Sequence, residues 1–220
     1  MTESVNGSWP RRTARARETR AAILRAATRL FVDQGYTATT MPAIAKAASV
    51  TRATVFNSVG GKAQVLKACY DIAVVGDDEH LPLFRRPEME AMFAEPDAGR
   101  TLERYAQIIA GVGRRIGGLY EVFRLASGAD PEARQLWEEI QRERLVGATH
   151  FVRMLAAKAS LRSDLSAQEA ADLVWVHIDN GLYVRLVTER GWSHERFERW
   201  FARTLRAQLL EEGGDQMAPP

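Results

Sequence analysis

Apolar residues recur at helical spacing along most of the chain. Between residues 16 and 34, they fall at i, i+1, i+4, i+7 and i+8, which is the pattern of one buried helix face: Ile23, Leu24, Ala27, Leu30 and Phe31. Similar stripes follow in the second half, and no stretch alternates apolar and polar residues as a half-buried strand does. The pattern therefore predicts an all-α protein.

In the second half, helices are predicted at residues 102–112, 119–125, 131–155, 166–189 and 193–210. Ser166 and Glu169 have the spacing of a capping box, and Ser193 can cap the last helix. Glycines cluster at 111–118, which predicts a chain break or a close helix contact there. The Asp179-Asn180-Gly181 sequence falls inside a predicted helix and indicates a kink.

Residues 39–62 have the pattern of two short helices joined by a tight turn. Thr40 can cap the first helix and Thr51 the second, because each hydroxyl can accept from a free backbone N–H of the following turn. The second helix offers Arg52, Thr54 and Asn57 on its polar side. This arrangement is the helix-turn-helix geometry, in which the second helix enters the major groove of DNA.

A three-helix DNA-binding domain is therefore predicted at residues 16–62, with the first helix covering the apolar backs of the other two. Gly60 and Gly61 end the second short helix, and Lys62 begins a connector helix at 62–75, where phosphates would pass. A larger helical regulatory and dimerisation domain is predicted at residues 63–212. Residues 213–220 are expected to be a frayed tail.

The net charge of the 220-residue chain is +2, but it is divided unequally. Residues 1–67 hold 11 Lys or Arg against 3 Asp or Glu, and residues 68–220 hold 19 against 25. Residues 1–67, called the head here, are thus basic, and residues 68–220, called the body, are acidic. This division predicts that only the head attracts a polyanion. A single cysteine, no apolar leader and no long apolar run lead us to expect a cytoplasmic protein without membrane contact.

Two segments lack helical periodicity. Residues 1–15 carry an arginine cluster and are predicted to be a disordered basic tail, which either solubilises the chain or contacts phosphates or the minor groove. Residues 76–97 contain three prolines and are predicted to be a long connection with at most a short helix near residues 88–93. The run Asp77-Asp78-Glu79-His80 is interpreted as a solvated loop, so no metal site or cofactor is predicted.

The segment ILRAATRLFVDQGYTATTMPAIAKAASVTRATVFNSVGGKAQVL resembles the N-terminal domain of TetR-family (tetracycline-repressor-like) transcriptional regulators. The resemblance covers roughly residues 20–68, and the last two predicted helices look like those of many members. It implies an all-α homodimer that binds a palindromic operator on double-stranded DNA, with a small-molecule pocket in each body. The implied function is a ligand-responsive regulator, most simply a repressor that its ligand releases.

The resemblance also implies roles for residues of the head. It assigns the DNA backbone to Thr40, Thr51, Phe56 and Lys62, and the bases to Arg52, Ala53, Thr54 and Asn57. Arg can bind guanine and Asn adenine through two hydrogen bonds each, whereas Ala53 can only touch a thymine methyl group. A phosphate contact is the alternative for Arg52.

The head departs from the family pattern at three positions. Ser49 stands where the family often has Gly, Phe56 where it usually has Tyr, and Ser58 where an aromatic residue is common. Phe56 lacks the hydroxyl that would donate to a phosphate. More of the contact with the DNA backbone is therefore expected from Thr40, Thr51, Lys62 and the arginine tail.

Two sets of residues in the body are candidates for binding. Aromatic rings with a polar group or a wide face suit a mostly apolar ligand pocket, although such rings more often belong to the core: Tyr105, Trp137, Phe151, Trp175 and His177. The last two helices carry more apolar surface than a terminal hairpin can bury, which predicts a dimer interface at Leu173, Val176, Leu182, Leu186, Phe197, Trp200, Phe201 and Leu205.

The competing class of function is a helical small-molecule-binding protein or an enzyme whose head is coincidental. The chain has no Gly-rich phosphate loop, CxxC or HExxH motif, and its histidines are isolated. His177 and Asp179 are two residues apart and would face different sides of a helix. A regulator without catalytic residues is the interpretation that the sequence favours.

Overall fold

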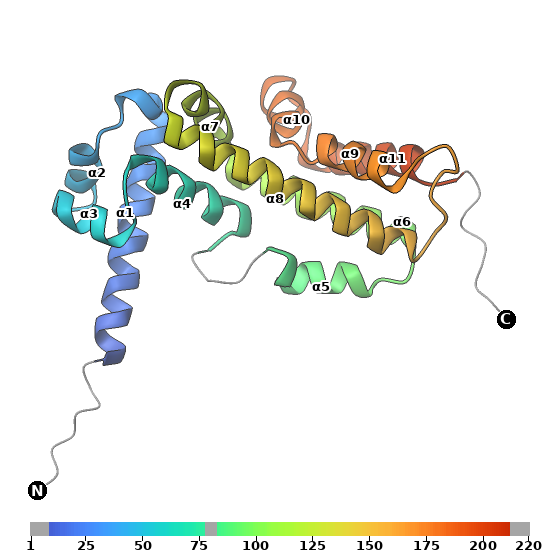
Figure 1. The fold of residues 1–220 in the computed structure, drawn as a ribbon, viewed down its shortest axis with the longest axis horizontal. Coiled ribbons are helices and arrows are strands. Elements are labelled where there is room, and N and C mark those ends of the chain that lie inside the picture. The colour runs from blue at the N-terminus through green and yellow to red at the C-terminus, as the bar shows by residue number, and fades with distance from the viewer. Residues whose placement is uncertain (1–8, 78–82, 212–220) are drawn as a thin grey trace, which may run out of the picture. The chain divides into compact units, whose positions relative to one another are not determined.

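The computed structural model describes residues 9–77 and 83–211, with side chains from residue 14 onward. These residues form helices, with one isolated bridge between Leu161 and Leu210, so the predicted all-α class is confirmed (Figure 1). In chain order the elements are α1 (Trp9–Ala38), α2 (Met41–Ala47), α3 (Arg52–Ser58), α4 (Lys62–Val75), the 3-10 turn η1 (Leu83–Arg85), α5 (Pro87–Ala94), α6 (Ala98–Ile116), α7 (Gly118–Ala129), α8 (Pro131–Ala156), α9 (Ala167–His177), α10 (Asn180–Tyr183), the π-helical turn η2 (Val184–Glu189) and α11 (His194–Leu209).

The first helix begins earlier than its apolar pattern predicts. Helix α1 starts at Trp9 rather than near residue 16, because Ala and Arg are good helix formers and Pro10 is tolerated in a first turn. Residues 9–15 are thus helical rather than disordered, and residues 1–8 of the predicted tail lie outside the described residues. So do the predicted tail at 213–220 and residues 78–80 of the acidic loop.

The chain divides into two compact units. Unit 1 comprises Met1–Ala73 and Gly118–Trp137, and unit 2 comprises Val74–Gly117 and Glu138–Pro220. Unit 1 is larger than the predicted three-helix domain, because most of α4, α7 and the first turns of α8 belong to it. The pairing of α7 with α1 is a long-range contact that local periodicity does not contain.

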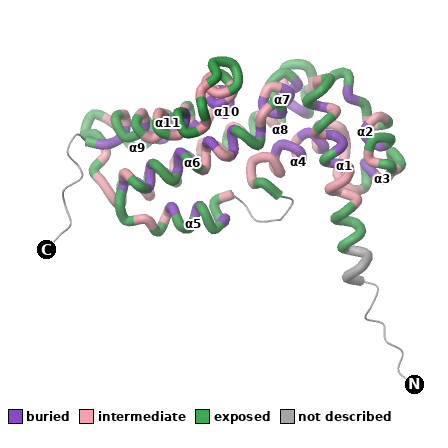
Figure 2. The backbone as a smooth tube through the Cα atoms, turned by 180° about the vertical axis from the view of Figure 1, so that it is seen from behind, coloured by how far each residue is buried: buried purple, intermediate pink, exposed green. Residues whose placement is uncertain are grey.

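Unit 1 is built around the buried stripe of α1. Ile23 and Phe31 are inaccessible to solvent, as are Ile44 of α2 and Val55 of α3, and both short helices contact α1. Figure 2 shows buried segments of all three helices in purple. A second cluster in this unit is aromatic and joins α4, α7 and α8, with Tyr70, Tyr120, Phe123 and Trp137 in edge-on or tilted contacts. The two clusters make the small head part of a larger core.

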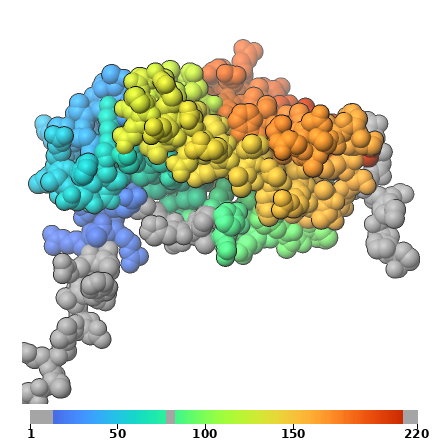
Figure 3. Space-filling view, viewed as in Figure 1, coloured from blue at the N-terminus to red at the C-terminus, as the bar shows by residue number. Residues whose placement is uncertain are grey.

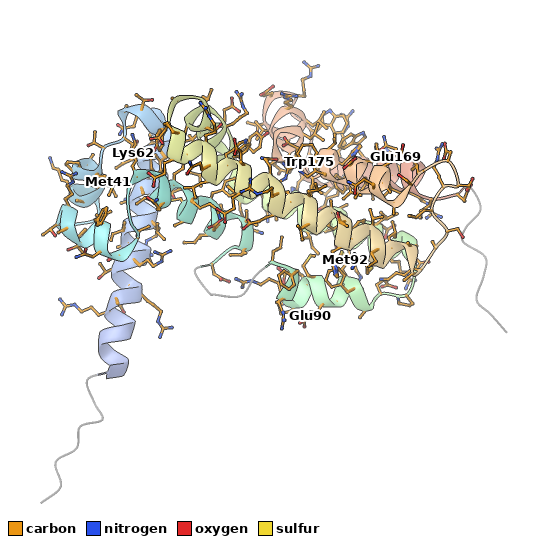
Figure 4. The ribbon with its side chains drawn as sticks, viewed as in Figure 1. Met41, Lys62, Glu90, Met92, Glu169 and Trp175 are labelled. Carbon is orange, nitrogen blue, oxygen red and sulfur yellow. The ribbon has the colours of Figure 1, made fainter. Side chains whose placement is uncertain are left out.

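Unit 2 surrounds a core shared by α5, α6, α8, α9 and α11. Met92 of α5 is fully buried in it, whereas Glu90 on the same helix is exposed (Figure 4). The predicted glycine effects are both present: Gly117 ends α6 with φ 44°, and the ring of Tyr183 lies so close to Gly113 that a Cβ there would approach it to 2.5 Å. The predicted kink is also confirmed, since α9 ends before Asp179.

Lys158 holds the end of α5 in place. Its Nζ donates to the carbonyl oxygens of Phe93 at 3.0 Å and Met92 at 3.3 Å, and also to Glu95 O and to Thr101 Oγ1. Burial lowers the pKa of this ammonium, partly offset by the attraction of Glu95. The lysine therefore satisfies carbonyl groups that the end of a helix leaves without N–H partners.

The substitution Lys158→Met is expected to lower the free energy of unfolding by about 1–3 kcal/mol, because it keeps the apolar stem but leaves these carbonyls without a donor. Urea denaturation followed by circular dichroism measures the change. Lys46→Met, at an exposed lysine, is the matched control and should shift the free energy by less than about 0.5 kcal/mol. Equal effects of the two substitutions would contradict the capping role.

Candidate nucleic-acid interface

The two short helices α2 and α3 begin at the predicted threonine caps. The Thr40 side chain accepts from Ala43 N at 3.2 Å, and that of Thr51 accepts from Thr54 N at 3.1 Å. Between the helices, Val50 N donates to Ala45 O at 2.9 Å and closes the turn. The helix-turn-helix predicted at 39–62 is thus formed by local sequence, one cap for each helix.

Helix α3 is oriented by contacts with α1 and α2. Val55 is fully buried on its inner side, and Arg20 of α1 donates through Nη1 to Ser58 O at 2.9 Å, at the last residue of α3. One apolar anchor and one polar anchor therefore fix both the roll of α3 and the position of its C-terminal end.

Five of the eight residues that sequence reasoning assigned to DNA lie on α3, and Thr51 caps this helix. Six of the eight are exposed: Thr40, Thr51, Arg52, Ala53, Phe56 and Asn57. Phe56 has 63% of its surface exposed, which is costly for a large apolar ring in water. Figure 3 shows α2 and α3, in light blue and cyan, at the surface of unit 1. Thr54 is half-buried, and its hydroxyl is 2.9 Å from that of Thr51.

Lys62, the remaining candidate, contacts other residues of the head (Figure 4). Its Nζ lies 4.1 Å from the centre of the Tyr36 ring and donates to Thr37 O at 3.4 Å. Burial lowers the pKa of the ammonium, and the nearby Asp130 carboxylate opposes this shift. Lys62 is thus half-buried at the start of α4, where a cation–π contact holds it.

Tyr36 connects this lysine to the N-terminus of α8. Its hydroxyl donates to Asp130 Oδ2 at 2.8 Å, while Oδ1 of the same carboxylate accepts from the backbone N–H groups of Glu132 and Ala133. The Ala133 N–H, with help from Tyr36 and Lys62, lowers the pKa of Asp130, and burial raises the pKa of Tyr36. Asp130 is therefore the N-cap of α8 and its link to α1.

The body candidates are distributed over both units. Tyr105 and Phe151 are buried in unit 2 with their rings stacked at 3.8 Å, and His177 lies 6.4 Å from Phe201, which also contacts Tyr105. His177 Nδ1 is 2.8 Å from Leu173 O. Trp137 does not join this group, because it packs in the aromatic cluster of unit 1.

Arg144 of α8 is a polar residue of unit 2 that sequence reasoning missed. Its guanidinium contacts Asp179 Oδ2 at 3.1 Å and Trp175 O at 2.9 Å, and lies 5.4 Å from the Trp175 ring. Its Nε is buried without a hydrogen-bond partner. The sequence contained a sign of this residue, because Arg144 interrupts the apolar stripe of Ile140, Ala148 and Phe151 at helical spacing.

Comparison with known proteins decides what the head is. Residues 23–69 match the family described as bacterial regulatory proteins, tetR family. Residues 23–69 are therefore a TetR-family domain. A search of curated protein sequences gives no match.

Solved structures of transcriptional regulators share this fold. One from Saccharomonospora viridis in complex with choline has a TM-score of 0.65 at 20% identity, over 88% of this chain and 98% of that one. NalD, the secondary repressor of the MexAB-OprM multidrug efflux pump in Pseudomonas aeruginosa, has 0.64 at 20%, over 89% and 98%. FadR from Bacillus subtilis in complex with stearoyl-CoA has 0.65 at 17%, over 84% and 96%.

The apolar residues predicted for a dimer interface fall into two groups in the structure. Phe197, Phe201 and Leu205 are at most 1% exposed, because α11 turns this face into the core of unit 2. Their amphipathic pattern therefore has an intramolecular partner. The residues with accessible surface are Leu173, Val176, Leu182, Leu186 and Trp200, of which Val176 is 51% exposed.

No group of three or more side chains that could hold a metal ion occurs among residues 9–77 and 83–211. Within the same ranges, no helix is long and apolar enough to cross a membrane.

The turn between α2 and α3 explains one departure from the TetR-family pattern. Ser49 has φ 56° and is the non-glycine residue with positive φ in the described chain. Glycine adopts this region freely, whereas a residue with a Cβ is strained there by about 1–2 kcal/mol. The glycine that the family often has at this position would remove that strain.

Ser49→Gly is expected to raise the free energy of unfolding by about 0.5–1 kcal/mol, since relief of strain exceeds the extra chain entropy of glycine. Ser49→Ala is the matched control, because it removes the hydroxyl and keeps the Cβ. Urea denaturation of the three proteins checks the order. A glycine variant no more stable than the alanine variant would show that the turn is unstrained.

Proposed function

We propose that this TetR-family chain is a transcriptional repressor that binds a palindromic DNA operator as a homodimer and is released by a small molecule. The observation that carries this proposal is the outer side of α3, where Arg52, Ala53 and Asn57 are exposed together on a helix held by Val55 and Arg20. A helix of this width fits the major groove. Such a protein would act in the cytoplasm, where its DNA lies.

The chemistry of α3 suggests a division of roles. Arg52 and Asn57 can each form two hydrogen bonds, with guanine and adenine respectively, and Ala53 can contact a thymine methyl group. Thr40 and Thr51 cap their helices and lie where backbone phosphates approach helix N-termini. Thr54 supports Thr51 through its hydroxyl, and Lys62 retains donors for a phosphate beyond its bond to Thr37 O.

An effector site in unit 2 is supported by the polar and aromatic residues around Arg144. The buried Nε of Arg144 has no partner, and leaving such a donor unsatisfied costs about 1–3 kcal/mol. A ligand with an acceptor oxygen would remove this penalty. Tyr105, Phe151, Trp175 and His177 offer the flat apolar surfaces that suit the rest of the molecule.

The effector would act on DNA binding through the helices that the two units share. Helix α4 crosses from unit 1 to unit 2 after Ala73, and α8 crosses after Trp137. A ligand that favours one arrangement of unit 2 would change the separation of the two heads, whose half-sites are ~34 Å apart. Couplings of this kind are typically about 1–3 kcal/mol.

A homodimer is proposed because a single head offers few base contacts. The accessible residues Leu173, Val176, Leu182, Leu186 and Trp200 form the candidate surface, and Val176 would be its most exposed apolar member. Sedimentation at micromolar concentration tests this directly. A monodisperse monomer would contradict a dimer.

The proposed function is tested by salt-dependent gel shifts on the promoter region of the chain's own gene and by genome-wide binding. A regulator occupies discrete palindromic sites at which affinity falls steeply with salt. The alternative, a helical small-molecule-binding protein or enzyme, predicts no specific site anywhere in the genome. That result would refute the regulator.

Arg52→Ala is expected to reduce discrimination at one base pair of each half-site by about 1–3 kcal/mol, because the guanidinium reads a base edge. Affinities for the operator and for operators with single base changes provide the measurement. Arg29→Ala, an exposed arginine of α1, is the control and should leave discrimination unchanged. If Arg52→Ala weakens all sequences alike, Arg52 contacts a phosphate.

Arg144→Lys is expected to abolish the response to the effector and leave operator affinity within about twofold, because a lysine keeps the charge beside Asp179 but has no Nε–H. The effector used would be a compound that raises the melting temperature of the wild-type protein and releases it from the operator. Arg142→Lys, at an exposed arginine on the same helix, is the control. An unchanged response in Arg144→Lys would remove Arg144 from the site.

A further inference from the structure

Phe56 is an exposed apolar residue of α3 that the folding of unit 1 does not explain. It has 63% of its surface exposed, more than any other phenylalanine of the described residues. The inner side of this short helix is already filled by Val55, which is fully buried. Because successive residues of a helix are about 100° apart, Phe56 points away from that inner side. The outward position of the ring therefore needs a reason outside the core.

The position of Phe56 around α3 places the ring on the surface proposed to meet the bases. In angular order, the exposed residues of this helix are Arg52, Phe56, Ala53 and Asn57, at about 0°, 40°, 100° and 140°. Val55 lies at about 300°, so the direction opposite to it, at about 120°, falls between Ala53 and Asn57. Phe56 and Ala53 are neighbours at i and i+3 spacing. The ring thus extends the apolar surface that begins with the Ala53 methyl group.

The chemistry of an apolar ring limits what it can recognise in the major groove. Base edges there present hydrogen-bond donors and acceptors, and the C5-methyl group of thymine is their apolar feature. Phe56 has no hydroxyl group, so it cannot donate to a phosphate. Deoxyribose also offers apolar surface, but it lies along the backbone and not on the groove floor toward which Ala53 would point. Contact with a thymine methyl group is the interaction that removes both this ring and a base edge from water.

The fold holds this ring on a rigid support. Val55 fixes the inner side of α3, Thr51 caps its N-terminal end, and Arg20 donates to Ser58 O at 2.9 Å at its C-terminal end. A phenylalanine side chain has two torsions, so little rotamer entropy is lost when it makes a contact. The ring is therefore positioned before DNA binds, as discrimination between bases requires.

We propose that Phe56, with Ala53 beside it, recognises the C5-methyl group of a thymine in each half-site of the operator. The partner is double-stranded DNA, and the chemical group recognised is the methyl group in the major groove. Phe56 is then a specificity-determining residue and not a backbone contact, which is the role that the family resemblance implies for it. This inference rests on the proposed function, since it requires that α3 lies in the groove.

The test removes the methyl groups from the DNA and the ring from the protein. The probe is an operator selected by the wild-type protein from random duplexes, then synthesised with deoxyuridine in place of thymidine at one symmetry-related pair of positions at a time. Deoxyuridine pairs as thymidine does but lacks the C5-methyl group. The variants are Phe56→Ala, which removes the ring, and Phe56→Tyr, which keeps it. Val146→Ala, at a 70% exposed valine of α8 in unit 2, is the matched control.

At one pair of positions, the wild type is expected to lose about fourfold in affinity for each methyl group removed, or about fifteenfold when both half-sites are changed. Phe56→Ala should bind the thymine and uracil forms of this pair within about twofold of each other, because the ring that contacts the methyl group is gone. Phe56→Tyr and Val146→Ala should keep the wild-type ratio. Equal melting temperatures would show that all variants fold.

Two outcomes on DNA that the wild type binds would refute the role of Phe56. The first is a wild type that does not distinguish thymine from uracil at any position. The second is a Phe56→Ala variant that binds all duplexes more weakly but keeps the ratio, because the ring would then contact the backbone. If the wild type itself binds no DNA, the proposed function fails instead.

Discussion

The head depends on the packing of the α1 stripe beneath α2 and α3. Ile23 and Phe31 of α1, Ile44 of α2 and Val55 of α3 are all fully buried, and two helices of seven residues each have no stability of their own without such a surface. The threonine caps then decide where each short helix begins, and the Arg20 bond to Ser58 O holds the C-terminal end of α3 against α1. The polar side of α3 faces outward because the apolar side of this helix packs toward α1.

Local features of this fold were predictable because they have local causes. The caps at Thr40, Thr51, Ser166 and Ser193 follow from side chains that reach N–H groups three residues away, and the connector helix has the predicted bounds, Lys62–Val75. The exposed residues of α3 were predictable for the same reason, since the spacing that buries Val55 exposes Arg52 and Asn57.

Features that join distant residues were not predictable from periodicity. Tyr36 binds Asp130, which lies 94 positions later in the chain, and no local pattern predicts that Lys62 would lie over the ring of that tyrosine. The pattern of α11 likewise shows that Phe197, Phe201 and Leu205 are covered, but it cannot say whether the cover is a second subunit or the core of the same one. A hydrophobic stripe identifies a buried face, and the partner must come from the tertiary structure.

The two helices that cross between the units are each fixed by a polar contact within one unit. Near the C-terminal end of α4, Val74 O accepts from Arg115 Nη2 of α6 at 2.7 Å, inside unit 2. At the N-terminal end of α8, Asp130 accepts from Tyr36, inside unit 1. A change in unit 2 that moves α6 would therefore displace the C-terminal end of α4 through the Arg115 bond. A change that moves α8 would displace Tyr36 through Asp130, and the Tyr36 ring contacts Lys62. The contact with Tyr36 leads to Lys62, the first residue of α4 and the neighbour of the helix-turn-helix, so signal transfer in the proposed repressor can use helices that are already in place.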